Sequence, residues 1–120
     1  MSRLIERVNR QIKKEISMII EREIDDPRLE FISIVRVDTS RDLSLAKIYF
    51  SVYPESGSEV AKETLEEMNK FIRVLLGRRI RLKFLPALEF IIDDSVKYSV
   101  DIYEKMEKIK DELGEDSQID

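Results

Sequence analysis

Apolar residues recur every three or four positions over the first part of the chain. The members of this stripe are Ile5, Val8, Ile12, Ile16 and Ile19. Side chains at such spacings lie on one face of an α-helix, so the pattern predicts an amphipathic helix over residues 3–22. Ser2 is suited to be its N-cap. Pro27 ends the helical region, because the residue before a proline avoids helical backbone angles.

The next segment alternates between apolar and polar positions, as β-strands do. Residues 31–38 are rich in Ile and Val, and Val35 and Val37 are expected on one face of a strand. Residues 45–53 alternate without interruption, and the side chains predicted to share a face are Ala46, Ile48, Phe50 and Val52. The polar turn at residues 39–44 is short, so the two strands are predicted to form an antiparallel hairpin.

Helical spacing returns after the hairpin, in a stripe made of Ala61, Leu65, Met68, Ile72 and Leu75. Ser56 and Glu59 fit a capping box before this helix, and Gly77 fits its C-cap. Period two then runs over residues 80–92 and predicts a third strand, in which Pro86 implies an edge position or a bulge. The residues expected on one face of that strand are Leu82, Phe84, Leu88, Phe90 and Ile92.

A last helix is predicted after the third strand. Asp93-Asp94-Ser95 would cap it, and its apolar stripe consists of Ile102, Met106, Ile109 and Leu113. Residues 114–120 read as a loose acidic tail. The element order helix, strand, strand, helix, strand, helix predicts one α+β domain over residues 1–113, with helices on one face of a three-stranded sheet.

Composition narrows the functional classes. The 120 residues include no Cys and no His, which removes disulfides, thiol nucleophiles, and the commonest general base and zinc ligand. An enzyme is therefore disfavoured. Apolar runs such as Met18-Ile19-Ile20 are far too short to span a membrane, and the first fifteen residues lack the apolar core of a signal peptide.

Charge is distributed unevenly along a chain whose formal net charge is −4. Residues 70–83 carry six basic and no acidic side chains: Lys70, Arg73, Arg78, Arg79, Arg81 and Lys83. Compensation of a helix C-terminus needs one or two cations, so a cluster of six favours phosphate binding. In the first helix Arg3, Arg7, Arg10 and Lys14 form a stripe opposite the isoleucines. That stripe is either a second phosphate contact or an ordinary solvated face.

Two other patterns carry weaker signals. Tyr49 and Tyr53 could stack on bases, but exposed tyrosines on strands more often pack across the strand pair. The acidic pairs Asp25-Asp26, Glu66-Glu67 and Asp93-Asp94 could bind a cation or act as acid and base. Adjacent acids point apart on a helix or strand, so capping and solvation explain them better.

Several short motifs occur in a fixed order. They are Asp26-Pro27-Arg28-Leu29, Ser40-Arg41-Asp42-Leu43, Ala46-Lys47, Phe71-Ile72-Arg73, Leu76-Gly77, Arg81, Pro86, Leu88-Glu89-Phe90 and Asp93-Asp94-Ser95. In this order and spacing, residues 3–110 resemble the ribosome-binding factor A family, whose members are bacterial assembly factors of the small ribosomal subunit.

The resemblance implies a type II KH-like fold in which the middle helical segment is usually two helices. The family replaces the Gly-x-x-Gly loop of other KH domains with a kink at Ala-x-Gly. The matching positions here are Met68-Asn69-Lys70, which lack the glycine. Asn69 tolerates unusual backbone angles and can host a milder bend, or Met68 simply continues the apolar stripe. Lys70 would add a phosphate-facing charge.

The resemblance also implies binding to immature small subunits, a part in late maturation of small-subunit rRNA without catalysis, and a role in growth at low temperature. We expect a cytoplasmic monomer that binds the subunit and its rRNA and needs no cofactor, metal, membrane or small-molecule substrate. The residues expected to contact RNA are Arg3, Arg7, Arg10, Lys14, Asn69, Lys70, Arg73, Arg78, Arg79, Arg81 and Lys83.

Two other binding functions remain open from the sequence. One is a generic KH-type module that binds single-stranded RNA by sequence, although the missing Gly-x-x-Gly weighs against it. The other is a protein-interaction domain whose basic face meets an acidic partner. The first predicts tight binding to short unstructured oligonucleotides, and the second predicts a complex that survives nuclease treatment.

Overall fold

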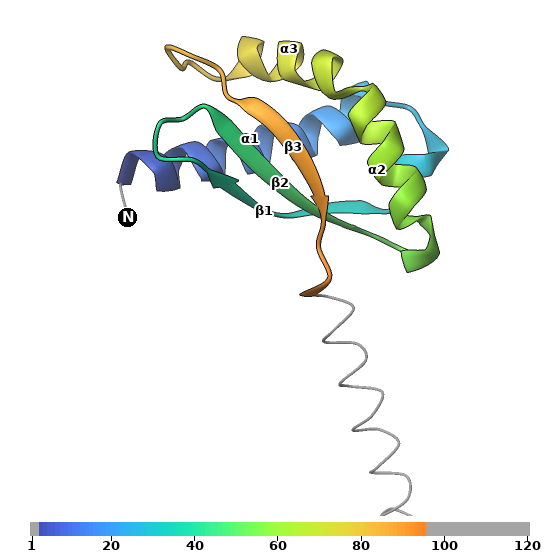
Figure 1. The fold of residues 1–120 in the computed structure, drawn as a ribbon. Coiled ribbons are helices and arrows are strands. Elements are labelled where there is room, and N and C mark those ends of the chain that lie inside the picture. Colours follow the sequence, from blue (N-terminus) through green and yellow to red (C-terminus); the bar gives the residue numbers. More distant parts are fainter. Residues whose placement is uncertain (1–2, 96–120) are drawn as a thin grey trace, which may run out of the picture.

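The computed structural model describes residues 3–95. The helices and strands are α1 (Arg3–Glu23), β1 (Ile32–Thr39), β2 (Leu45–Val52), α2 (Ser58–Glu67), α3 (Asn69–Arg79) and β3 (Ala87–Ile92), with short 3-10 helices η1 (Pro27–Leu29) and η2 (Glu55–Gly57). Figure 1 shows two layers, with the helices on one face of the sheet. The predicted α+β arrangement is confirmed over these residues.

The three strands form one sheet in the order β1-β2-β3. β1 and β2 are antiparallel, and β2 and β3 are parallel, so Ile48 in the central strand pairs with Val37 on one side and Phe90 on the other. A parallel pair needs a long crossover, which α2 and α3 provide. The predicted hairpin of the first two strands is confirmed.

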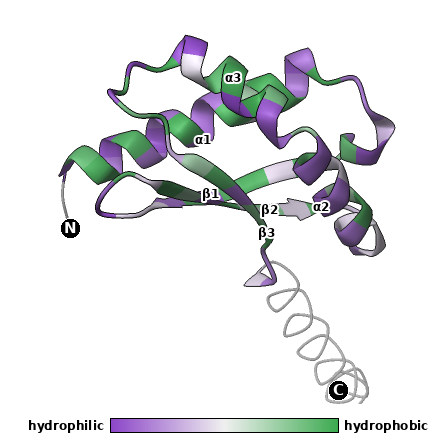
Figure 2. Ribbon diagram, turned by 45° about the horizontal axis from the view of Figure 1, so that its top comes forward, coloured by the Kyte–Doolittle hydropathy of each residue, from purple (hydrophilic) through white to green (hydrophobic). Residues whose placement is uncertain are grey.

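The core lies between the sheet and the helices. The apolar stripe of α1 is buried as predicted, with Ile12, Ile16 and Ile19 fully inaccessible to solvent. Ile48 and Phe50 meet them from the sheet and are equally inaccessible. Figure 2 shows the alternation of hydrophobic and hydrophilic bands along α1 that this burial requires.

A bulge in β1 changes which side chains face the core. The pairing with β2 shifts between Ile34 and Arg36, so Val35 is an extra residue in the strand. Ile34 and Val37 are consequently the buried positions, whereas Val35 is only half-buried. The expectation that Val35 and Val37 share a face is wrong, because the bulge breaks the period of two.

The middle helical segment is two helices, separated by Met68. This residue adopts φ −95° and ψ 4°, which ends α2 and starts α3 without a positive φ, so no glycine is needed. The bend falls on Met68 and not on Asn69. Met68 is half-buried and still packs against the core.

Both predicted caps of this segment are wrong. Ser56 lies in η2, and α2 begins after Gly57 without a side-chain cap. Gly77 is not a C-cap either, because α3 continues to Arg79 and ends at Ile80. A Cβ at position 77 would lie 3.2 Å from Cδ2 of Leu85, so the glycine allows the following loop to pass close to the helix.

The predicted third strand is shorter than its period-two pattern. Only Ala87–Ile92 is a strand, and residues 80–86 form the loop that leads into it. Leu82 is half-buried and Phe84 is exposed in that loop, so they do not share the strand face of Leu88 and Phe90. Pro86 marks the boundary, since it cannot donate a hydrogen bond to the sheet.

The last predicted helix and the acidic tail lie outside the described residues. At the boundary, the Asp93 side chain accepts a hydrogen bond of 2.7 Å from the backbone N–H of Ser95. None of the described helices is both long and apolar enough to cross a membrane.

Candidate nucleic-acid interface

The cationic stripe of α1 faces solvent as predicted. Arg3, Arg7, Arg10 and Lys14 are all exposed, on the side opposite the buried isoleucines. No ion pair within residues 3–95 engages any of these four side chains. Their charges are therefore available to a ligand.

The second group of cations lies on α3 and in the loop that follows it. Lys70 lies in its first turn, Arg78 in its last turn, and Arg81 and Lys83 in the loop that follows. All four are exposed, and none forms an ion pair with another described residue. The Nζ of Lys83 lies 5.7 Å from the centre of the Phe84 ring. Free cations of this kind can bind phosphate groups.

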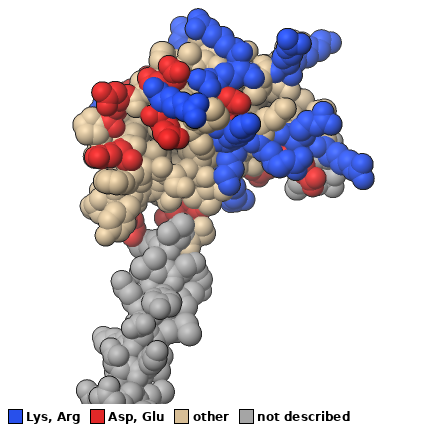
Figure 3. Space-filling view, turned by 180° about the vertical axis from the view of Figure 1, so that it is seen from behind, with Lys and Arg blue, Asp and Glu red and all other residues tan. Residues whose placement is uncertain are grey.

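We call these two groups together the basic surface: Arg3, Arg7, Arg10, Lys14, Lys70, Arg78, Arg81 and Lys83. Figure 3 shows Lys and Arg side chains gathered over the top and one end of the molecule, while Asp and Glu side chains gather toward the other end. The chain is acidic overall, yet its folded domain presents separate basic and acidic regions.

Arg79 differs from its neighbours in the predicted cluster. Its Nη1 lies 3.4 Å from Oε2 of Glu15, and its Nη2 lies 3.2 Å from Oε1 of Glu23, both on α1. The side chain is 27% exposed. Two carboxylates thus compensate this guanidinium, and it links α3 to α1. Of the residues predicted to contact RNA, Arg79 is thus one whose charge is already paired within the domain.

Arg73 is also bound within the domain. Its Nε donates to the carbonyl of Pro86 at 3.0 Å, and its Nη2 donates to the carbonyl of Leu85 at 2.7 Å. These bonds hold the end of the 80–86 loop against α3. The guanidinium keeps its positive charge, because carbonyl groups do not neutralise it, but its orientation is set by the loop.

Asn69 connects the start of α3 to the sheet. Its Nδ2 donates to the backbone carbonyl of Leu88 in β3 at 2.9 Å, and the residue is only half-exposed. The amide therefore anchors the helix at the bend. Of the eleven residues predicted to contact RNA, Asn69, Arg73 and Arg79 have structural partners, and the other eight form the basic surface.

Phe84 is a candidate nucleic-acid contact that the sequence pattern did not predict. It was expected to share a strand face with Leu88 and Phe90, but its side chain is 72% exposed in the 80–86 loop. Phe71 and Val74 are also about half-exposed, on the outer side of α3. Phe71 and Val74 lie off the apolar stripe of the middle helix, and Phe84 lies two residues before Pro86, which were the only signals for them in the sequence. An exposed aromatic ring among cations suits a nucleic-acid base.

The open face of the sheet holds a cross-strand pair. The guanidinium carbon of Arg36 lies 3.8 Å from the centre of the Tyr49 ring, and the two residues are partners in the β1–β2 register. The expectation that Tyr49 packs across the strands is confirmed. Tyr53 is 78% exposed at the end of the hairpin.

Comparison with known proteins identifies the family. The model of the family described as ribosome-binding factor A matches residues 5–106. A curated ribosome-binding factor A from Carboxydothermus hydrogenoformans is 45% identical over 114 residues, which cover 92% of this chain and 89% of the relative. One from Halothermothrix orenii is 40% identical, with 93% of each chain covered.

The chain belongs to the ribosome-binding factor A family.

Solved structures of ribosome-binding factor A share the fold. The crystal structure of the Thermus thermophilus protein matches with a TM-score of 0.68 and 28% identity, over 73% of this chain and 94% of that one. The solution structure of a Thermotoga maritima protein matches with a TM-score of 0.62 and 28% identity, over 72% and 83%. The KH-like fold expected from the resemblance is confirmed.

A third match is a Thermus thermophilus ribosome-binding factor A fitted into a cryo-electron microscopy map of its complex with the 30S subunit. It has a TM-score of 0.60 and 27% identity, over 79% of this chain and 97% of that one. The likeness extends over most of the part of the chain that the structure describes.

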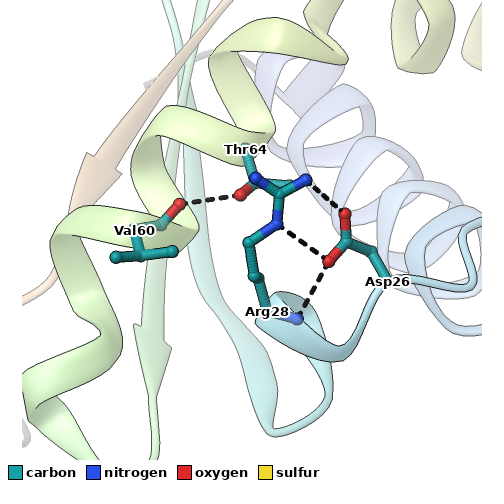
Figure 4. A network of polar contacts seen from close by, with 4 residues as sticks. All are labelled: Asp26, Arg28, Val60 and Thr64. Carbon is teal, nitrogen blue, oxygen red and sulfur yellow. Dashed lines mark hydrogen bonds and ion pairs between the residues drawn. The ribbon is translucent and has the colours of Figure 1, made fainter.

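Two motifs that carried the family resemblance are structural. Asp26 caps η1 and accepts from the backbone N–H of Arg28 at 2.9 Å, while Nη2 of Arg28 lies 2.6 Å from its Oδ2. These bonds lower the pKa of Asp26 to about 2. Figure 4 shows the pair beside α2, where the Thr64 hydroxyl donates to the Val60 carbonyl.

Within residues 3–95, no group of three acids could hold a metal ion.

The turn between β1 and β2 is organised by Asp42. Its Oδ1 accepts from the hydroxyls of Ser40 and Ser44, at 2.8 and 2.7 Å, and from the backbone N–H of Ser44 at 3.1 Å. The Ser44 and Ser40 bonds lower its pKa to about 2. Leu43 has a positive φ of 61°, which is unusual for a leucine and is held by this network. The exposed Arg41 therefore lies in a turn that these hydrogen bonds organise.

Proposed function

We propose that this family member binds the small ribosomal subunit through its rRNA and assists late rRNA maturation without catalysing a reaction. The observation that carries the proposal is the basic surface, eight exposed cations without a carboxylate partner among residues 3–95 of an acidic chain. The relative fitted into a map of a 30S complex supports the same partner.

Phosphate contacts supply the affinity in this proposal. Arg78, Arg81 and Lys83 form the main contact, because they extend from a helix end and a loop that Arg73 holds in place. The stripe on α1 forms the second contact. Contacts of this kind position a protein on RNA but do not read its sequence, so the shape of the folded rRNA supplies selectivity.

Phe84 adds a stacking contact, which does not depend on charge. Its exposed ring beside Lys83 can stack on an unpaired base, which is worth roughly 1–3 kcal/mol. A rigid domain that binds one rRNA conformation better than its competitors shifts the population toward that conformation. This differential binding is sufficient for an assembly factor and needs no catalytic group.

The proposal includes the remaining expectations of the family resemblance. The domain covers residues 1–113 and acts as a cytoplasmic monomer, with a role in growth at low temperature. Low temperature stabilises incorrect RNA base pairs as well as correct ones. A factor that favours one rRNA conformation would therefore matter most at low temperature.

Cosedimentation tests the proposed function. The purified chain is mixed separately with immature and with mature small subunits, at equal concentration and salt. We expect it to sediment with the immature particles and to stay in the supernatant with the mature ones. Equal binding to both, or release by a short unstructured oligonucleotide at similar concentration, would favour a generic single-stranded RNA module instead.

A further inference from the structure

A groove lies on the acidic part of the domain, away from the basic surface. It has a volume of about 710 Å³ and runs between the C-terminal half of α1, the 24–30 segment and the first half of β1. Ile20, Ile24 and Ile32 line it as an apolar floor. A groove of this size can hold a peptide segment or a small molecule.

One wall of the groove is the free edge of the sheet. β1 is an edge strand, because the strand order is β1-β2-β3. The carbonyl of Phe31 accepts from the N–H of Tyr53, directly after β2, so the backbone groups of Phe31 point toward that strand. Backbone direction alternates along a strand, so those of Ile32 and Ile34 point the other way, into the groove.

The same edge is covered further along the strand. The backbone N–H of Thr39 donates to Oδ1 of Asn9 on α1 at 2.9 Å. Within residues 3–95 no such cap reaches Ile32 or Ile34. The open edge thus includes the stretch of β1 that lines the groove. Unpaired strand edges are templates for an added strand.

The charge around the groove selects the kind of partner. Glu21, Asp25 and Glu30 line it and are exposed, and no Lys or Arg lines it. Asp26 also lines it but is already paired with Arg28. The other three carboxylates have no ion-pair partner among the described residues, and they repel RNA phosphates. They also repel the chain's own residues 104–120, which hold seven acidic and three basic side chains.

We propose that this groove binds an extended, Lys- and Arg-rich peptide segment of a partner protein, which adds to β1 as a further strand. The peptide backbone pairs with Ile32 and Ile34. The aliphatic stems of its basic side chains pack on the isoleucine floor, and their charged ends reach Glu21, Asp25 and Glu30. The same domain thus presents a basic surface for RNA and a separate acidic groove for a basic protein segment.

A labelled peptide provides the test. The probe is a fluorescent eight-residue peptide of alternating Lys and Val, and the measurement is its fluorescence anisotropy as the full-length chain is added. We expect saturable binding that weakens at least tenfold in the Glu21→Lys/Asp25→Lys variant. The matched control, Glu59→Lys/Glu66→Lys on α2, makes the same change of charge at exposed positions and should alter affinity less than twofold.

A second probe separates strand addition from simple charge attraction. A peptide of the same sequence and charge, N-methylated at alternate residues, cannot donate the backbone hydrogen bonds of one edge. We expect the peptide methylated on its pairing edge to bind at least fivefold more weakly than the one methylated on the other edge. This comparison uses the unmodified protein, so misfolding of a variant cannot imitate the result.

Several results would overturn the proposal. Equal loss of peptide binding in the groove variant and the α2 variant would mean that attraction to overall charge suffices. Equal binding of the two N-methylated peptides would exclude strand addition. Self-association of the chain that is lost in the groove variant would make a second copy the occupant instead.

Discussion

Arg79 on α3 and Glu23 on α1 are 56 residues apart in the sequence and form an ion pair of 3.2 Å. Arg79 reaches Glu15 with its other terminal nitrogen, at 3.4 Å. The adjacent Arg78 has no such partner among residues 3–95. Two neighbouring arginines therefore have different roles, one in helix packing and one in binding.

Replacing each arginine by alanine should separate these roles. Arg79→Ala removes two partly exposed ion pairs and should lower the free energy of unfolding by about 0.5–1.5 kcal/mol. Arg78→Ala should change it by less than about 0.5 kcal/mol, as exposed positions usually do. Urea unfolding gives the stabilities and subunit cosedimentation gives the binding. A stable Arg79→Ala variant that binds worse than Arg78→Ala would refute the assignment.

Thr39 offers a way to stabilise the domain. Its hydroxyl is buried and has no hydrogen-bond partner among residues 3–95, although its backbone N–H is bonded to Asn9. Thr39→Val replaces that hydroxyl with a methyl group of similar size and should raise the free energy of unfolding by about 1 kcal/mol. Thr64→Val is the control, because the Thr64 hydroxyl donates to Val60. If the two variants change stability alike, the Thr39 hydroxyl has a partner in solution.

The turn at Asp42 should contribute to acid sensitivity. Its pKa is lowered from 3.8 to about 2 by hydrogen bonds from Ser44 and Ser40, so the folded state favours the charged form. This stabilisation is complete above about pH 4 and is lost as the pH falls toward 2. Asp42→Asn should therefore flatten the decline of the urea midpoint over this range. An unchanged slope would show that the carboxylate is not held this way.

Gly77 should tolerate a side chain. It lies inside α3, where glycine costs about 1 kcal/mol relative to alanine. A new Cβ would approach Cδ2 of Leu85 at 3.2 Å, but this is the end of a half-buried loop side chain that can move a few tenths of an ångström. We expect Gly77→Ala to stabilise the domain by roughly 0.5 kcal/mol. Destabilisation would show that the 80–86 loop is fixed too tightly to adjust.

Periodicity predicted those features that depend on neighbouring residues. The spacing of Ile5 to Ile19 determines both the buried face of α1 and the exposure of the opposite cations. The hairpin followed from alternation and a short turn. The bulge at Val35 was missed, because one extra residue leaves the composition of a strand unchanged. The period of two over residues 80–92 predicted a strand that is too long, because the loop before Pro86 alternates by chance.

The sequence predicted which residues carry positive charge at the site, but it could not predict which of them have partners in the folded domain. Lys70, Arg78, Arg81 and Lys83 are exposed as expected. Arg73 and Arg79 look identical to them in sequence, and only tertiary structure brings carbonyls or carboxylates to their guanidinium groups. The groove was not predicted, because its walls come from α1 and β1, whose separation no local pattern specifies.

The role of the basic surface can be measured directly by the salt dependence of binding to immature small subunits. Arg78→Ala/Arg81→Ala should lower affinity about tenfold at moderate salt and reduce the slope of log affinity against log salt by roughly 1.5. The matched control, Arg22→Ala/Lys62→Ala, removes two cations elsewhere and should leave both quantities unchanged. If both variants bind with the affinity and slope of the original chain, the basic surface does not hold the rRNA.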